Sequence, residues 1–144
     1  MSLSKSKVYF FSQGVKLTLQ SRTRLKGFIE SIFNKEGKRL SSINYIFCTD
    51  KALLEINKQF LKHDFYTDII TFDLSESAEI TAEIYISVDR VRDNAKNLGV
   101  SFKSELLRVI FHGALHLSGY KDKTKLEKAD MSEKEDHYLN KYDN

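Results

Sequence analysis

The chain has 144 residues, 41% of them hydrophobic and 30% charged, with a formal net charge of +3. This length predicts a single domain over residues 1–144, and the composition is typical of a soluble globular protein. No apolar run approaches about 18 residues, the N-terminus lacks the apolar core of a signal peptide, and the lone Cys48 excludes an intrachain disulfide framework, so we expect a cytoplasmic protein with no membrane segment.

Positive charge gathers in the first third of the chain. Residues 1–44 carry nine Lys or Arg against Glu30 and Glu36, whereas the remainder carries fourteen against eighteen carboxylates. Basic patches suit phosphate backbones, because each neutralised phosphate releases counterions. A solvated helix face explains the same bias, and charge alone favours that simpler interpretation.

The first half of the chain predicts strands alternating with helices. Residues 8–11 and 15–19 are predicted to be strands around a turn at 12–14. The helix that follows is marked by an apolar stripe of Leu25, Phe28, Ile29, Ile32 and Phe33. Residues 43–48 predict a strand ending in an inert core thiol, Cys48. Asp50 is expected to cap a helix whose apolar residues are Leu53, Leu54, Ile56 and Phe60.

The second half continues the alternation. Residues 69–74 predict a buried strand, and the alternating pattern over 80–88 is typical of a half-buried strand. Ser87 is expected to cap a short helix that Gly99 ends. A helix over 102–117 follows, and a charged helix over 125–142 has a predicted inner face of Leu126, Met131, Tyr138 and Leu139. This order of elements predicts an α+β (α/β layered) fold, in which a mixed β-sheet is packed with helices.

Two histidines carry the most informative chemistry. His112 and His116 are four residues apart, so on a helix they lie on the same face, one turn apart. Gly119 then ends the helix and lets the chain turn back, so Asp122 can return as a third ligand. Two imidazoles and a carboxylate with an open fourth position are typical of a catalytic zinc site. We therefore expect one Zn²⁺, or another divalent transition metal, per chain.

The helix around the histidines supports this interpretation. It is apolar on most sides, so it is predicted to be buried. One polar stripe crosses it, made of Glu105, Arg108, His112 and His116. An unpaired buried polar group costs about 2–7 kcal/mol, and a metal would satisfy two of these side chains. Core histidines bonded to backbone are the alternative, which the context of Gly119 and Asp122 disfavours.

Gly113 argues against a metallopeptidase. In enzymes with the H-E-x-x-H pattern, the residue after the first histidine is the glutamate that acts as general base. Glycine cannot take a proton. It also costs a helix interior about 1 kcal/mol relative to alanine, which predicts close approach of another backbone or of a substrate at this position.

Three short stretches of the chain, taken together, form a set of motifs. Residues 112–120 read H-G-A-L-H-L-S-G-Y, residues 64–72 read D-F-Y-T-D-I-I-T-F, and residues 82–87 read A-E-I-Y-I-S. In order and spacing they resemble the motifs of the YbeY family, and the chain has family length. The resemblance implies a metal-dependent endonuclease that cleaves single-stranded RNA in ribosomal RNA maturation and ribosome quality control. It implies ribosomal RNA and a ribosomal subunit as partners, with no DNA.

Two departures from the family pattern bear on the site. Where the family has a third histidine, this chain has Asp122, which can still bind zinc but changes the charge of the site. Where the family has an arginine, this chain has Leu61. The resemblance ties that arginine to RNA handling, and Lys62 or His63 could substitute for it.

Lys62, His63 and Asp68 are the candidate substrate-binding residues. They lie in a loop between a helix and a strand, where functional groups are often placed, although a solvated loop is the simpler reading of His63. Asp68 could instead bond local backbone in a turn or orient a histidine ligand. His137 lies in a highly charged helix and is expected to be a solvated surface residue. No residue is identified as the general base.

The sequence thus favours a metal-dependent, single-strand-specific endoribonuclease. The basic N-terminal region and Lys62 would hold the RNA backbone. The main alternative is a non-catalytic ribosome-assembly factor that binds RNA and uses a structural metal to hold its fold. A metallopeptidase is the third possibility, which Gly113 disfavours.

Overall fold

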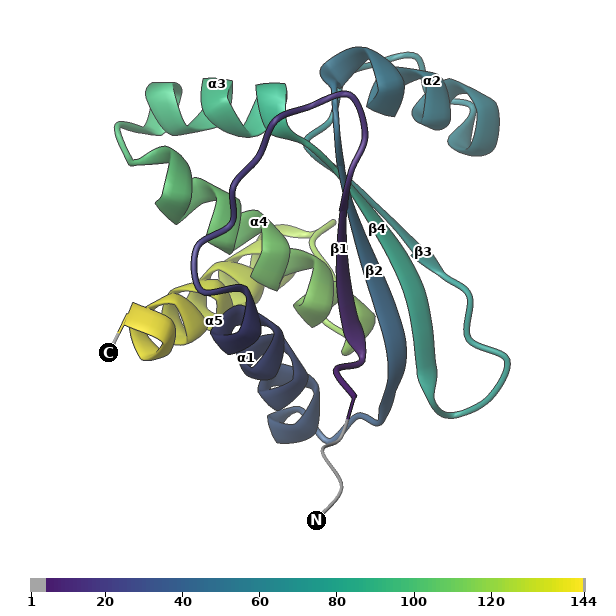
Figure 1. Ribbon diagram of the computed structural model, residues 1–144, viewed down its shortest axis with the longest axis vertical. Helices are drawn as coiled ribbons and strands as arrows, with labels where there is room; N and C mark the ends of the chain where they lie inside the picture. Colours follow the sequence, from purple (N-terminus) through teal and green to yellow (C-terminus); the bar gives the residue numbers. More distant parts are fainter. Residues whose placement is uncertain (1–4, 144) are drawn as a thin grey trace.

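Four strands form one mixed sheet in the computed structural model, which describes residues 5–143 (Figure 1). The strands are β1 (Val8–Ser12), β2 (Leu40–Cys48), β3 (Ile69–Asp73) and β4 (Ile80–Ser87). They lie in the order β1-β2-β4-β3. Both β1 and β4 run parallel to β2, and β3 runs antiparallel to β4. The predicted mixed sheet is therefore confirmed.

Five helices surround the sheet within the described part of the chain. They are α1 (Arg22–Lys35), α2 (Asp50–Leu61), α3 (Val88–Leu98), α4 (Phe102–Leu117) and α5 (Lys125–Asp143). Helices α1 and α4 cover one face of the sheet, and α5 packs against α4 (Figure 1). Helix α2 contacts β3 and β4 from the opposite face, and α3 packs against α4. The arrangement confirms the predicted α+β class.

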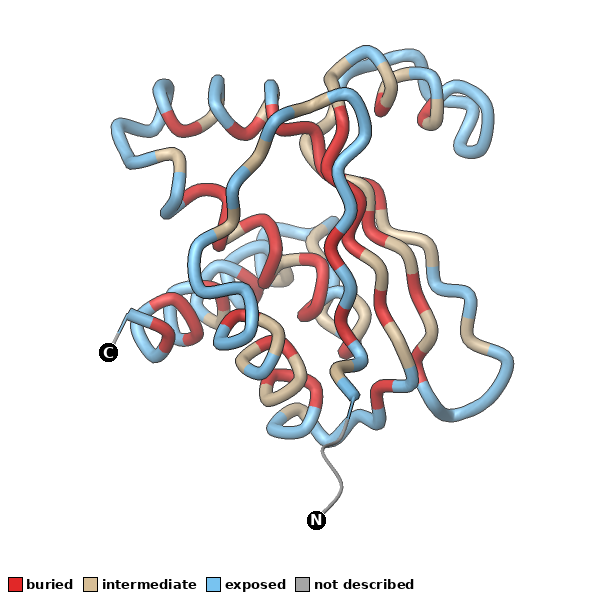
Figure 2. Tube along the Cα trace, viewed as in Figure 1, coloured by how far each residue is buried: buried red, intermediate tan, exposed pale blue. Residues whose placement is uncertain are grey.

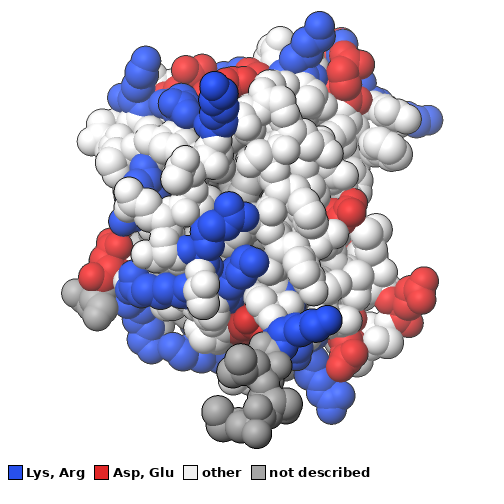
Figure 3. Space-filling model, viewed as in Figure 1, with Lys and Arg blue, Asp and Glu red and all other residues white. Residues whose placement is uncertain are grey.

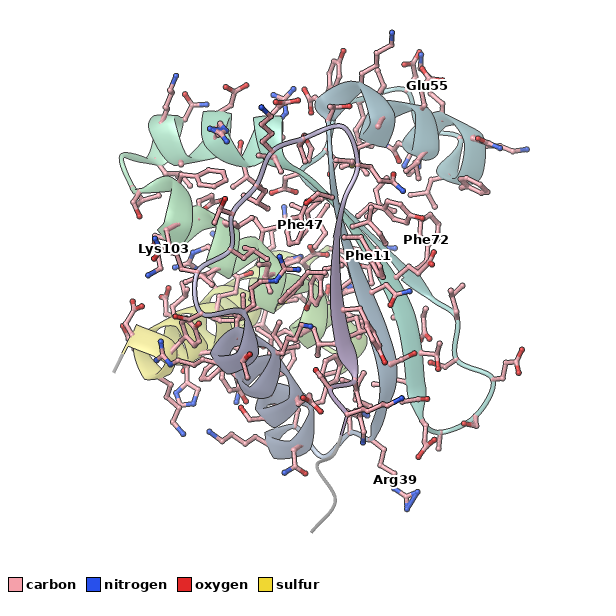
Figure 4. The ribbon with its side chains drawn as sticks, in the orientation of Figure 1. Phe11, Arg39, Phe47, Glu55, Phe72 and Lys103 are labelled. Atoms are coloured by element: carbon pink, nitrogen blue, oxygen red, sulfur yellow. The ribbon has the colours of Figure 1, made fainter. Side chains whose placement is uncertain are left out.

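The core lies between the sheet and the layer of α1 and α4, where the buried residues of these strands and helices gather (Figure 2). Side chains alternate between the two faces along each strand. Val8 and Tyr45 on the helix side have no exposed surface. Phe47 also lies on this side, whereas Phe72 lies on the opposite side (Figure 4). The buried hydroxyl of Tyr45 donates a hydrogen bond of 3.0 Å to the carbonyl of Ile110, which ties β2 to α4.

Several predicted boundaries are confirmed. Helix α4 spans the predicted residues 102–117. The Ser87 side chain accepts a hydrogen bond from the Arg90 amide at 3.1 Å and caps α3. Gly99 ends α3 in the left-handed conformation, with φ of 68°. These features are local, so the sequence around them is sufficient to predict them.

The predicted strand over 15–19 is wrong. After β1 the chain forms bends at 13–15 and an irregular segment over 16–19. Val15, Leu17 and Leu19 pack against the core shared with the helices. The alternating pattern therefore reflects burial against that core, without a partner strand.

The predicted cap of α2 is also wrong. Thr49 is the N-cap, and its hydroxyl accepts a hydrogen bond of 3.1 Å from the Ala52 amide. Asp50 is the first helical residue, and its carboxylate instead binds the Arg90 side chain at 2.7 Å. Threonine and aspartate are both good caps, so the sequence left the choice to tertiary contacts.

Some residues predicted to be buried are exposed. Leu74 lies beyond the end of β3, in the loop that joins β3 to β4, and is 50% exposed. Within the predicted buried strand only Ile70 is buried. Leu126, which was predicted to lie on the inner face of the last helix, is 73% exposed in the first turn of α5. The buried face of α5 consists of Met131, Glu135, Tyr138, Leu139 and Tyr142. The other predicted inner residues of that helix are confirmed.

Cys48 is fully buried, as predicted. Burial raises the pKa of its thiol to about 11, and the carboxylates of Asp89 and Asp50 add to the shift. The thiol is therefore protonated at neutral pH and a poor nucleophile. None of the helices in residues 5–143 is both long and apolar enough to cross a bilayer.

Candidate functional site

The polar stripe of α4 faces a cleft of about 480 Å³. Segment 61–71, which runs from the last residue of α2 into β3, contributes much of the opposite wall. The ionisable side chains from α4 and the segments after it are Glu105, Arg108, His112, His116, Asp122 and Glu135. The stripe therefore lines one solvent-accessible site, to which distant parts of the chain contribute.

His112 is held through both ring nitrogens. Nδ1 lies 2.6 Å from Oε2 of Glu135, and Nε2 lies 3.3 Å from Oδ2 of Asp122. Glu135 is only 9% exposed at its side chain and also accepts a hydrogen bond of 2.8 Å from Arg108. Burial opposes the charged imidazolium, yet the bond to Glu135 and the nearby carboxylates raise the pKa of His112 above its ordinary value.

The turn after α4 brings Asp122 back to the histidine, as the spacing predicts. Ser118 caps the end of α4, and Gly119 then adopts φ of 113°, which an L side chain rarely adopts. His116 is exposed on the same helix face and lines the same cleft as His112. All three predicted ligands thus border one cavity.

The donor chemistry fits a divalent ion. Two ligands bound about 2.0–2.1 Å from a tetrahedral zinc lie about 3.3–3.4 Å apart, and His112 Nε2 and Asp122 Oδ2 have a comparable separation. The Glu135 contact on Nδ1 is the outer partner that a ligating histidine usually has. Within residues 5–143, however, no three His, Cys, Asp or Glu side chains already form a group that could hold an ion. The ligand set therefore stays a prediction.

Two further carboxyl groups lie in the cleft. Asp68 is held by Asn94, whose side-chain amide donates to Oδ2 at 3.3 Å. Burial raises the pKa of Asp68, although the positive charge of His112 opposes the shift. Burial also raises the pKa of Glu105, and the charge of Asp68 adds to it. A carboxyl with a raised pKa can exchange a proton nearer to neutral pH.

Segment 61–71 places its predicted residues differently. His63 lines the cleft, and its ring stacks on Phe65 with centroids 5.0 Å apart and planes 20° apart. Leu61, at the position of the family arginine, also lines the cleft. Lys62 ends α2 in the left-handed conformation, with φ of 56°, is exposed and does not line the cleft. The structure therefore brings His63 and Asp68 to the site and leaves Lys62 outside it.

Two buried polar residues of the site, Glu135 and Asn57, were not predicted from the sequence. Glu135 follows Met131 by four residues and precedes Tyr138 by three, so it lies on the buried face of α5. Asn57 follows Leu53 by four and is 1% exposed. A polar residue on an apolar helix face is the signal that could have found both. His137 is exposed and packs against Tyr138 outside the cleft, as predicted.

The structure gives a reason for glycine at position 113 that differs from the predicted one. A Cβ atom at this position would lie 2.7 Å from Cδ1 of Ile84 and 3.1 Å from Cδ1 of Ile69. Glycine therefore lets α4 pack closely on β3 and β4. The close approach is to side chains of the sheet, and the predicted approach of another backbone or of a substrate is wrong.

The basic N-terminal region lies outside the cleft. None of residues 5–44 lines it. Lys and Arg side chains gather around α1, at the lower left of Figure 3. This surface is therefore separate from the candidate metal site.

Comparison with known proteins identifies the family. The family model described as endoribonuclease YbeY matches residues 12–143 of this chain, which include the whole cleft. The chain belongs to the YbeY family. The resemblance of its three motif stretches to that family is confirmed.

Relatives called endoribonuclease YbeY cover nearly the whole chain. The one from Cytophaga hutchinsonii is 46% identical over 95% of this chain and 96% of its own length. Those from Flavobacterium psychrophilum and Chlorobaculum tepidum are 45% and 48% identical over 90% and 81% of this chain, and over 92% and 85% of their own lengths. A solution structure of a protein from Thermotoga maritima is 30% identical, with a TM-score of 0.65 over 94% of this chain and 88% of that chain. The fold described above is therefore shared with a solved relative.

Proposed function

We propose that this YbeY-family chain is a metal-dependent endoribonuclease that cleaves single-stranded RNA during ribosomal RNA maturation and ribosome quality control. The family match supports the endoribonuclease class. The observation that carries the site assignment is the return of Asp122 to within 3.3 Å of His112, in the cleft that His116 also lines. His112, His116 and Asp122 are the proposed ligands of one Zn²⁺ or similar divalent ion.

The chain's own residues have separate roles in this proposal. Glu135 accepts the Nδ1–H of His112, which leaves the Nε2 lone pair facing the cleft. Arg108 holds Glu135 in place. When bound, the ion would act as a Lewis acid on a phosphoryl oxygen or on an attacking water. Asp68 and Glu105 are the cleft carboxyls that could take up or release a proton.

The proposal includes the partner and the compartment. Ribosomal RNA, within a ribosomal subunit, is the proposed substrate, and the cytoplasm is the proposed location. The single buried Cys48 is compatible with a reducing compartment.

Metal content and cleavage test the proposal together. Protein purified without a histidine tag is expected to hold one divalent ion per chain and to cleave single-stranded RNA in preference to duplex RNA. His112→Ala and His116→Ala should each abolish stoichiometric binding and cleavage, because each removes one of three protein ligands.

The same variants separate the rival function. If the protein were a non-catalytic assembly factor with a structural metal, His112→Ala should unfold and the wild type should not cleave RNA. Loss of cleavage with the fold and RNA binding retained supports the enzyme. One metal per chain in both variants would contradict the ligand assignment.

A further inference from the structure

The stacked rings of His63 and Phe65 form an aromatic surface on the cleft wall. Phe65 is 56% exposed, and His63 is exposed as well. Both residues line the same cleft as His112 and His116. We propose that this pair, the base platform, stacks an unpaired nucleobase of single-stranded RNA beside the metal site. The proposal rests on the proposed function and adds a base-binding subsite to it.

The geometry of the pair suits stacking. The two rings lie 5.0 Å apart with an interplanar angle of 20°, so they are nearly parallel. Offset parallel rings have π faces that attract a third ring in the same way. Because every base has a π face, such a surface binds single strands with little dependence on sequence.

The backbone below the base platform is fixed. The side-chain amide of Asn57 donates to the Phe65 carbonyl at 2.9 Å, and Asn57 is 1% exposed. Asp64, which precedes Phe65 in the chain, has its carboxylate 3.5 Å from the ammonium nitrogen of Lys58. Tyr66, which follows Phe65, has the Arg90 guanidinium over its ring, 5.1 Å from the ring centroid. A surface held in this way loses little conformational entropy when a base binds.

The location explains why the occupant would be a base of an unpaired strand. Most ionisable groups of the cleft lie on α4 and on the segments after it, whereas Leu61, His63 and Phe65 line the wall formed by segment 61–71, which also carries Asp68. A strand in the cleft could therefore present its phosphate to Arg108 and the histidines of α4 and its base to the aromatic pair. In a duplex the neighbouring bases already stack on both faces of each interior base, so a duplex excludes this contact.

Binding can be measured without catalysis. The probe is a short single-stranded RNA that carries one 2-aminopurine, whose fluorescence falls when the base stacks, and the buffer contains a chelator. Wild-type protein is expected to quench the probe. Phe65→Ala should remove the quench and weaken binding about fivefold or more, as expected for loss of one stacked base. Phe65→Leu, which keeps apolar bulk without a ring, should behave like Phe65→Ala, and Phe65→Trp should retain the quench.

Phe60→Ala is the matched control. Phe60 is 61% exposed and packs on Phe72 with ring centroids 5.9 Å apart, but it does not line the cleft. It should quench and bind like the wild type. Because Phe60 and Phe65 are both exposed, thermal unfolding should change little in either variant.

Two outcomes overturn the base platform. The first is a wild-type protein that leaves the probe fluorescence unchanged, whatever it does to RNA when metal is present. The second is a Phe65→Ala or Phe65→Leu variant that binds and quenches like the wild type. Cleavage of single-stranded RNA by the metal-loaded wild type tests the proposed function separately. A failure of the base platform can therefore be distinguished from a failure of the proposed function.

Discussion

At the residue scale, His112 connects the proposed ligands to the rest of the fold. One ring nitrogen faces Asp122, which follows it closely in the chain, and the other contacts Glu135 on a different helix. An outer partner of this kind fixes the orientation and tautomer of a ligating imidazole. Glu135 should therefore affect the metal without binding it.

Replacement of Glu135 by glutamine tests this positioning role. Glu135→Gln removes the carboxylate beside Nδ1 and should weaken metal affinity about 10- to 100-fold, the usual effect of losing such a partner. Metal titration followed by calorimetry measures the change. Asp136→Asn is the control, because Asp136 binds Arg108 and makes no contact with His112. Equal loss in both variants would show that Arg108, and not the imidazole, transmits the effect.

Asp122 is the residue at which this chain departs from the family pattern. Asp122→Ala should weaken metal affinity, because only two protein ligands remain. Asp122→His should keep the metal and move the rise of activity to lower pH, since a neutral ligand leaves the ion a stronger Lewis acid. Metal titrations and pH–rate profiles check both outcomes. Equal affinity of the wild type and Asp122→Ala would remove Asp122 from the site.

The sequence predicted part of this site and missed another part for a physical reason. His112, His116 and Asp122 lie within one helix and the turn after it, so local spacing is enough to group them. Glu135 and Asn57 reach the cleft or its wall only through tertiary packing. Lys62 was predicted to bind substrate from its loop position, but the left-handed end of α2 leaves it outside the cleft wall.

At the element scale, the packing of α4 on the sheet depends on a missing side chain. Gly113 lies where a Cβ would meet Ile84 and Ile69. Ile84 is itself fully buried, so its methyl group has little room to move. The close contact between helix and sheet therefore places His112 at the wall of the cleft.

Gly113→Ala should destabilise the fold despite the better helix propensity of alanine. Overpacking a core costs about 1–3 kcal/mol, against a gain of up to about 1 kcal/mol from propensity. Unfolding in denaturant measures the difference. Ile84→Val removes the methyl group nearest the new Cβ, so the double variant should lose less stability than the sum of the two single variants. Strict additivity would contradict the proposed clash.

Glu36, at the end of α1, links that helix to α5 and to the turn after α4. Its carboxylate accepts hydrogen bonds from Tyr138 and, at 2.8 Å, from Tyr120, and Lys134 lies 3.5 Å away. Burial opposes ionisation, yet these partners together lower the pKa of Glu36. A carboxyl with a lowered pKa stabilises the folded state above its unfolded pKa, and this stability is lost as pH falls through the folded pKa.

Glu36→Gln should therefore destabilise the protein at neutral pH by roughly 1–3 kcal/mol, because hydrogen bonds to a charged group are lost. The difference from the wild type should shrink as the pH falls through the folded pKa of Glu36. Denaturant unfolding at a series of pH values measures it. Glu30→Gln, on the same helix but outside these contacts, is the control. A difference that does not change with pH would show that shape, not charge, matters at this position.

At the scale of the whole molecule, the basic surface and the cleft are separate. Residues 5–44 contribute no side chain to the cleft, although most of the excess positive charge of the chain lies in its first third. RNA long enough to reach both surfaces would gain phosphate contacts far from the scissile bond. Substrate affinity and metal binding should then respond to different substitutions.

Charge reversal at Arg22, Lys26 and Lys35 tests this division. RNA affinity of the wild type should fall steeply with salt, and the triple variant should bind more weakly with a flatter dependence, because fewer counterions are released. Its metal affinity should equal that of the wild type. Binding isotherms at several salt concentrations give the slopes. An unchanged slope would show that this surface of α1 is only solvated.

The burial of Cys48 makes the native chain unreactive toward thiol reagents. The chain has one cysteine, and it has no exposed surface. A reagent can modify it only in molecules whose sheet has opened, so the labelling rate reports the opening equilibrium of the core. A second cysteine introduced on the surface would be labelled alone in the folded protein. Site-directed probes can therefore be attached near the cleft while the natural thiol stays in place.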